Sequence, residues 1–129
     1  MSVLAYMGYY YYDVTYLLVI LGAVLSMIAS AQVNSTFKRY SRVRSGCGMT
    51  GAEAAERILY RNGLTNVRIE HISGNLTDHY DPSSKVLRLS DATYNATSVA
   101  AVGVAAHECG HAVQHARGYA PLAIRGALV

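Results

Sequence analysis

Charged side chains are missing from a long stretch near the start of this 129-residue chain. No Asp, Glu, Lys, Arg or His occurs from Val14 to Phe37. An α-helix needs about 20 apolar residues to cross the roughly 30 Å of hydrocarbon in a bilayer. The stretch therefore predicts a transmembrane helix over residues 14–37. About ninety residues follow it, which is toward the lower end of the size range for a domain with a self-sufficient hydrophobic core.

Positive charge is missing from the first 37 residues, because all 11 Lys and Arg follow the apolar stretch. Several of them cluster in segment 38–44, which reads KRYSRVR. Basic residues favour the cytoplasmic side of a membrane helix, so we expect residues 1–13 outside the cell and the rest of the chain in the cytoplasm. The tyrosines before the helix are expected at the membrane interface, where aromatic side chains gather: Tyr6 and Tyr9–Tyr12.

A basic N-terminal region, which a secretory signal peptide would carry, is missing as well. Ala29-Ser30-Ala31 does resemble a cleavage site after an apolar run. The basic cluster that soon follows favours an anchor that stays uncleaved. Sequencing the mature N-terminus distinguishes the two.

Cysteine is scarce, since Cys47 and Cys109 are the two in the chain. In a cytoplasmic domain both would stay reduced. We interpret each as a small packing residue.

The remaining sequence predicts an α+β domain over residues 50–129, joined to the membrane helix by a basic, glycine-rich linker over residues 38–49. A helix is expected at the start of the domain, because Thr50 and Glu53 form a T-x-x-E capping box and Gly63 is a typical residue for its end.

Two further segments, 66–72 and 85–90, alternate apolar and polar residues and predict strands. We expect them to pair as an antiparallel hairpin with a long connection. A second helix is expected from about Thr97 to Ala116, because a glycine and then a proline follow. Its first half is apolar on every face, which predicts burial all round, and Gly103 and Gly110 predict close backbone packing.

The segment HECGH within this helix places His107 and His111 on either side of Glu108. Histidines at i and i+4 are about 6 Å apart along a helix, so both can bind one metal ion, and Zn²⁺ suits imidazole. Glu108 can reach a water on that ion, take its proton and later pass it to a leaving amine. This H-E-x-x-H arrangement is that of the zincin metalloproteases. The alternative is a buried helix whose histidines bond to backbone carbonyls.

A third protein ligand, which catalytic zinc sites normally have, is not evident. His115 lies about 12 Å from His107 along an unbroken helix, too far to share the ion. We expect His115 to pack or to bond a neighbour, and its position on the same helix makes it a candidate for a residue close to the site or to the substrate. The metzincin pattern also fails, because Gln114 and Arg117 occupy its glycine and histidine positions.

The loop over residues 73–84 offers another candidate. His79, flanked by Asp78 and Asp81, could approach the site from this loop. The three could equally form a solvated Asx-type turn. No Asp or Glu follows the motif, where other zincins carry their downstream ligand.

Residues 37–59, residues 76–129 and the preceding anchor resemble the YugP-type family of bacterial, membrane-associated neutral zinc metallopeptidases. The resemblance covers nearly the whole chain in register. It implies that His107 and His111 bind zinc and that Glu108 is the catalytic acid and base. Family members continue with more hydrophobic sequence, so the resemblance implies that this chain corresponds to their N-terminal portion and that the third ligand lies beyond it.

These observations predict one N-terminal transmembrane helix followed by a truncated zincin-like domain. The expected function is hydrolysis of peptides or proteins at the cytoplasmic face of a bacterial cell membrane. The alternative is a catalytically incomplete membrane protein that binds or scaffolds. Segment 38–44 is expected to attract anionic lipid headgroups rather than nucleic acid, because it adjoins a membrane span and only Tyr40 interleaves its charges. The oligomeric state does not follow from the sequence.

Overall fold

The computed structural model describes the backbone of residues 3–128 and the side chains of residues 13–128. The chain divides into two compact units, residues 1–37 and residues 38–129. The side chains of Tyr6 and Tyr9–Tyr12 lie outside the described residues, so their place at a membrane interface stays a prediction.

Helix α1, Val3–Ser41, makes up the first unit and continues into the second. From Asp13 to Ser41 it has the length and apolar composition to cross a membrane, and none of its most apolar window is buried by the protein. Leu17, for example, is 64% exposed. The basic linker expected at residues 38–49 is helical at its start, because α1 ends only at Ser41.

Helix α2, Gly51–Arg61, begins and ends where the sequence predicts. The Thr50 hydroxyl accepts a hydrogen bond from the Glu53 backbone N–H at 3.1 Å, and the Glu53 carboxylate accepts one from the Thr50 N–H at 3.2 Å. The predicted capping box is therefore present. Gly63 follows with φ of 71°, the left-handed backbone that favours glycine at a helix end.

The sheet has three strands, in the order β1-β3-β2, and the predicted hairpin is wrong. The segments expected to pair in antiparallel do pair, but β1 and β3 run parallel. The reason is a third, short strand inside the expected loop. This strand, β2, turns directly into β3 and takes the antiparallel place beside it, which leaves the other edge to β1. The strands are β1 (Arg68–Ile72), β2 (His79–Asp81) and β3 (Val86–Ser90).

Among the described residues, the sheet is followed by the helices α3 (Asp91–Tyr94), α4 (Val99–Ala116) and α5 (Ala120–Leu128). The Ser98 hydroxyl caps α4 by accepting from the Ala101 N–H at 3.1 Å. Gly118 has φ of 67° and ends α4 as predicted. Pro121 lies in the first turn of the next helix, where its missing N–H costs nothing.

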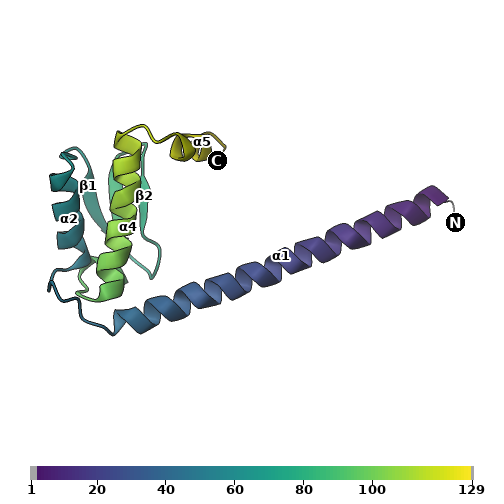
Figure 1. Ribbon diagram of the computed structural model, residues 1–129, viewed down its shortest axis with the longest axis horizontal. Helices are drawn as coiled ribbons and strands as arrows, with labels where there is room; N and C mark the ends of the chain where they lie inside the picture. The colour runs from purple at the N-terminus through teal and green to yellow at the C-terminus, as the bar shows by residue number, and fades with distance from the viewer. Residues whose placement is uncertain (1–2, 129) are drawn as a thin grey trace. The chain divides into compact units, whose positions relative to one another are not determined.

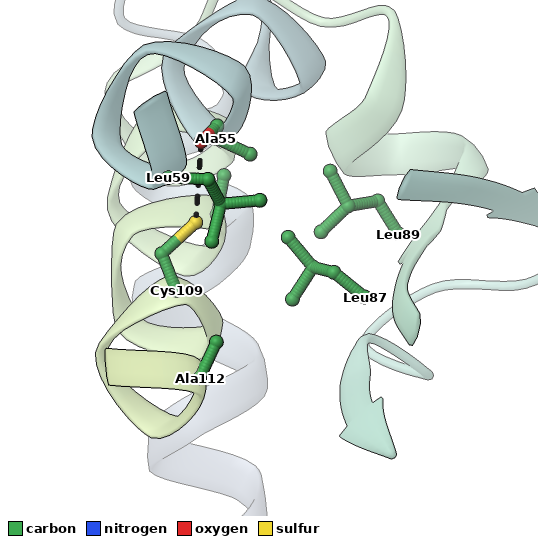
Figure 2. Packing of buried hydrophobic residues seen from close by; sticks show 7 residues of the cluster. Ala55, Leu59, Leu87, Leu89, Cys109 and Ala112 are labelled. Atoms are coloured by element: carbon green, nitrogen blue, oxygen red, sulfur yellow. Dashed lines mark hydrogen bonds between the residues drawn. The ribbon is translucent and has the colours of Figure 1, made fainter. Parts of the chain in front are cut away.

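The core lies where α2 and α4, side by side in Figure 1, cover one face of the sheet. Leu87 and Leu89 of β3 point into it, toward Ala55 and Leu59 of α2 and Cys109 of α4 (Figure 2). Full burial of each leucine contributes about 1.5–3 kcal/mol. The Cys109 thiol donates to the Ala55 carbonyl at 3.6 Å.

The prediction for Cys109 is confirmed and the one for Cys47 is wrong. Cys109 is buried, whereas Cys47 is exposed, with its Sγ 2.8 Å from the Ser45 hydroxyl. Cys47 lies in a turn of the linker before α2, among residues that are exposed or half-buried.

The prediction that the first half of α4 is buried on every face is also wrong. The helix buries a single row, Ala101, Ala105, Cys109 and Ala112. Its other side is open: Val99 is 41% exposed, and a Cβ added at Gly103 or at Gly110 would meet nothing within 4 Å. The reason is that α2 and the sheet together cover only one side of the helix.

Candidate metal centre

The motif lies on α4, away from the buried row of that helix. Cys109 and Ala112 face the core, whereas His107 is exposed and Glu108 and His111 are half-buried. The ring centroids of His107 and His111 are 4.8 Å apart, with the rings at 85° to each other. The two imidazoles therefore share one side of the helix, close enough to bind one metal ion.

His111 is oriented by a neighbour on its own helix. Its Nδ1 lies 3.2 Å from Oε1 of Gln114, and an amide oxygen only accepts, so Nδ1 carries the proton. The other ring nitrogen, Nε2, then holds the lone pair that a metal ion needs. Such a hydrogen bond to the second ring nitrogen is the usual support of a metal-binding histidine.

Glu108 has the environment of a proton acceptor. Partial burial raises the pKa of its carboxyl group, and the nearby His111 and His107 oppose that rise. A carboxylate with a raised pKa is a stronger base, and its proton transfer becomes useful closer to neutral pH.

A cavity of about 510 Å³ lies beside the motif. Its wall is formed by β2, the turn after it, α4 and α5. The lining residues are Asp78, His79, Tyr80, Pro82, His107, Glu108, His111, Leu122, Arg125 and Gly126.

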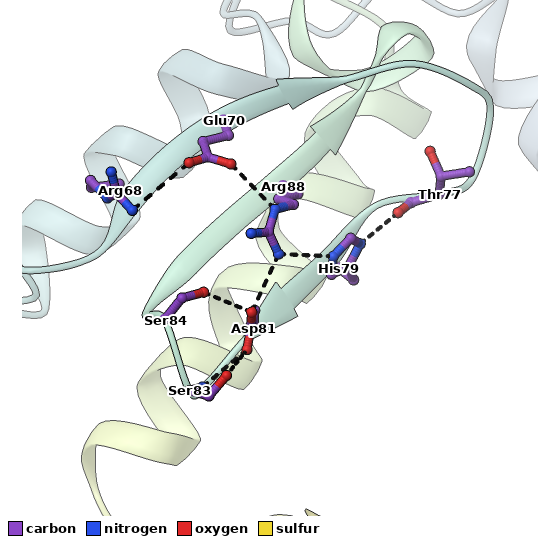
Figure 3. Close-up of polar contacts among 8 residues, drawn as sticks. All are labelled: Arg68, Glu70, Thr77, His79, Asp81, Ser83, Ser84 and Arg88. Atoms are coloured by element: carbon purple, nitrogen blue, oxygen red, sulfur yellow. Dashed lines mark hydrogen bonds and ion pairs between the residues drawn. The ribbon is translucent and has the colours of Figure 1, made fainter.

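His79 lines this cavity, but both of its ring nitrogens are engaged (Figure 3). Nδ1 donates to the Thr77 carbonyl at 2.8 Å, and Nε2 accepts from Arg88 at 3.4 Å. Arg88 also pairs with Glu70 of β1 at 3.2 Å and with Asp81 of β2 at 3.4 Å. Arg88 thus connects all three strands on one face of the sheet and helps to orient the His79 ring.

The two aspartates near His79, Asp78 and Asp81, are engaged in hydrogen bonds within the protein. The Asp78 carboxylate accepts from the backbone N–H of Ser90 at 2.7 Å and from its hydroxyl at 3.0 Å. Asp81 accepts from the Ser83 N–H at 3.0 Å, which is the Asx turn considered above. The hydroxyls of Ser83 and Ser84 hold the pKa of the Asp81 carboxyl well below its usual range.

His115 bonds a neighbour, as expected. Its Nδ1 lies 2.9 Å from the Tyr80 hydroxyl, which joins the end of α4 to strand β2. Tyr80 itself lines the cavity, and so does Arg125 of α5. Neither residue could be predicted from the sequence, because their approach to the motif depends on how distant segments pack and leaves no periodic signal.

Comparison with known proteins shows the family of the chain. Residues 15–129 match the family described as "Putative neutral zinc metallopeptidase". The chain belongs to this family. It is 50% identical over 101 residues to "Putative membrane protease YugP" of Bacillus subtilis (strain 168). The aligned part is 78% of this chain and 45% of that protein, so the chain spans less than half the length of this relative. No solved structure matches the chain.

The two histidines of the motif on α4 fit zinc, but they supply only part of the usual set of ligands. Two imidazoles on one helical face are typical zinc ligands. Between residues 13 and 128, however, no group of three His, Cys, Asp or Glu side chains lies close enough together to hold a metal ion. His79 and His115 do not complete the set, because other hydrogen bonds engage them.

Proposed function

We propose that this chain carries the catalytic helix of a membrane-anchored zinc metallopeptidase with a zincin-like domain. In this proposal His107 and His111 are two zinc ligands and Glu108 is the general base. The observation that carries it is the pair of imidazoles on one side of α4, 4.8 Å apart beside a cavity, in a chain of this family.

Zinc, when bound, would supply Lewis-acid activation of water and of the scissile carbonyl. Glu108 would take the proton from the attacking water, since burial raises its pKa and favours the protonated form. It would then deliver that proton to the nitrogen of the leaving amine. Gln114 would hold the His111 ring in place throughout.

The proposal requires a third ligand from outside the described residues, since they contain none. The Bacillus subtilis relative has room for one, because more than half of its length lies outside the aligned part. An acidic side chain or a histidine would complete the usual set.

Strand β2 supports a peptide as the substrate. It forms one edge of the sheet and lines the cavity beside the motif. The outer edge of such a strand presents backbone donors and acceptors that an extended peptide can pair with. A substrate bound in this way would place a backbone carbonyl beside Glu108.

The membrane arrangement that we propose has residues 1–13 outside the cell, residues 14–37 across the bilayer, and residues 38–49 as a juxtamembrane segment before the domain over residues 50–129. The absence of Lys and Arg before residue 38 supports this orientation. The exposed basic side chains of segment 38–44 are suited to anionic lipid headgroups.

Zinc binding and peptidase activity of the full chain in detergent micelles test the proposal. We expect His107→Ala and His111→Ala each to weaken zinc binding at least tenfold, measured by calorimetry. His71→Ala is the matched control, since His71 stacks on Tyr94 and lines no part of the cavity. Glu108→Gln should keep zinc and abolish any cleavage of a casein substrate.

The same measurements distinguish the proposed peptidase from the alternative, a membrane protein that binds or scaffolds. Zinc binding that His107→Ala leaves unchanged would overturn the assignment of the ligands. Zinc binding without cleavage, in this chain and in a longer one that includes a third ligand, would support a membrane protein that binds rather than hydrolyses.

A further inference from the structure

The cavity beside the motif contains a positive charge that the proposed chemistry does not use. Apart from its three histidines, the lining includes two carboxylic acids, Asp78 and Glu108, and one guanidinium group, Arg125. The Asp78 carboxylate is occupied by the backbone and hydroxyl of Ser90. Glu108 serves as the proposed base. Arg125 is therefore the charge that remains for a ligand.

Arg125 has no competing ion pair within the part of the chain that the structure describes. The ion pairs there involve Arg68, Arg88 and His71, on the sheet and at its end. Arg125 belongs instead to the last turn of α5, whose Leu122 and Gly126 line the same cavity. A Cβ added at Gly126 would meet nothing within 4 Å, so the space beside the arginine is open.

The chemistry of the guanidinium group indicates what this cavity would accept. Arginine presents a planar fork of N–H donors that matches a carboxylate in a bidentate pair. The rest of the α5 wall is apolar or lacks a side chain, so it does not supply a carboxylate of its own. The anion has to arrive with the bound molecule.

We propose that Arg125 is a specificity-determining residue that pairs with a carboxylate of the peptide substrate. This inference rests on the proposed function, because it takes the cavity as the place where a peptide binds. The carboxylate comes either from an acidic side chain near the scissile bond or from the C-terminus of the peptide. In both cases peptides with a carboxylate bind more tightly than their neutral counterparts.

The test is a binding measurement that needs no hydrolysis. The full chain with Glu108→Gln, in detergent micelles, is titrated with fluorescent Ala/Ser heptapeptides, with and without added zinc, and followed by anisotropy. One peptide has a central Glu and an amidated C-terminus. The second has Gln in place of Glu and is amidated, and the third has Gln and a free C-terminal carboxylate.

We expect at least one of the two carboxylate peptides to bind about fivefold more tightly than the neutral peptide. The peptide that shows the preference identifies the source of the carboxylate. Arg125→Gln should remove the preference, Arg125→Lys should keep part of it, and Arg125→Glu should favour a peptide with a central Lys. Arg61→Gln is the matched control: it removes the same charge from α2, outside the cavity lining.

Two outcomes would overturn the inference. One is equal binding of all three peptides to the parent protein. The other is a preference for carboxylate that persists in Arg125→Gln. Neither depends on zinc or on cleavage, so a failure of the proposed peptidase activity remains distinguishable from a failure of this inference.

Discussion

The two sides of helix α4 differ in packing and in chemistry. One side has small, buried residues, Ala101, Ala105, Cys109 and Ala112, and the last three belong to the core shared with α2 and the sheet. The other has Gly103, Gly110 and the motif, and it is largely open. Packing therefore determines where the helix lies, and the open side keeps the histidines accessible. The stability of the domain and its chemistry can consequently be changed separately.

The largest expected effect on the packed side comes from Leu87→Ala. Leu87 is fully buried under α2 and α4, so its loss leaves a cavity. We expect unfolding of the domain to become easier by about 3 kcal/mol. Chemical unfolding followed by circular dichroism measures this. Leu128→Ala is the control, because Leu128 is 82% exposed, and an equal loss there would contradict the assignment of the core.

The second effect concerns pH. Burial raises the pKa of the Cys109 thiol to about 12. In the unfolded chain the thiol ionises near pH 8.5, so only the unfolded state loses this proton in the range above that value. The contribution of the Cys109 thiol to the free energy of unfolding is therefore fully present below about pH 8.5, and it is lost as the pH rises toward 12.

Stability profiles between pH 7 and pH 10 check this expectation. The Cys109→Ala variant should show a flatter decrease above pH 8.5 than the parent protein, because it lacks the thiol. Cys47→Ala, which removes the exposed thiol, is the control. Parallel profiles for the parent protein and Cys109→Ala would show that the thiol does not contribute.

A third effect concerns the contact between strand β2 and the end of α4. Tyr80→Phe removes the hydroxyl that bonds His115 at 2.9 Å, and we expect a loss of about 1 kcal/mol in unfolding free energy. His115→Ala should cost a similar amount. Because the two residues share one bond, the double variant should lose less than the sum of both. Strict additivity would show that the bond is absent in solution.

The smallest effect is expected on the open side of α4. Gly103→Ala should stabilise the domain by up to about 1 kcal/mol, since alanine favours helix and the added methyl meets nothing. Gly51→Ala is the contrasting variant. A Cβ there would collide with the Thr93 carbonyl, so it should destabilise. Destabilisation by Gly103→Ala, measured by thermal unfolding, would show that another segment covers this side.

Local signals in the sequence predicted local structure well. The capping box at Thr50 and Glu53 and the glycine that ends α4 both behave as expected, because the interactions involved span only a few residues. The placement of His107 and His111 on one side of a helix follows from the helical period in the same way. The burial of α4 on all faces was wrong, because apolar composition does not reveal how much of a helix the neighbouring elements can cover.

The direction in which the strands pair was the other feature predicted wrongly. The alternation in segments 66–72 and 85–90 correctly indicated strands, but not their direction. The short strand His79–Asp81 has too few residues to show a period, and it takes the place next to β3. The prediction of which residues surround the motif was therefore incomplete as well, because Tyr80 and Arg125 reach the cavity from β2 and α5.

The sequence by itself determined the long apolar helix, the two histidines one turn apart with a glutamate between them, and the ends of the helices, since each depends on contacts within a few turns of one helix. Only the tertiary structure decided the parallel arrangement of β1 and β3, the side of α4 that remains open, and the residues that surround the motif. These depend on which distant segments bury each other's apolar surface, and many sheet orders satisfy the same local pattern equally well.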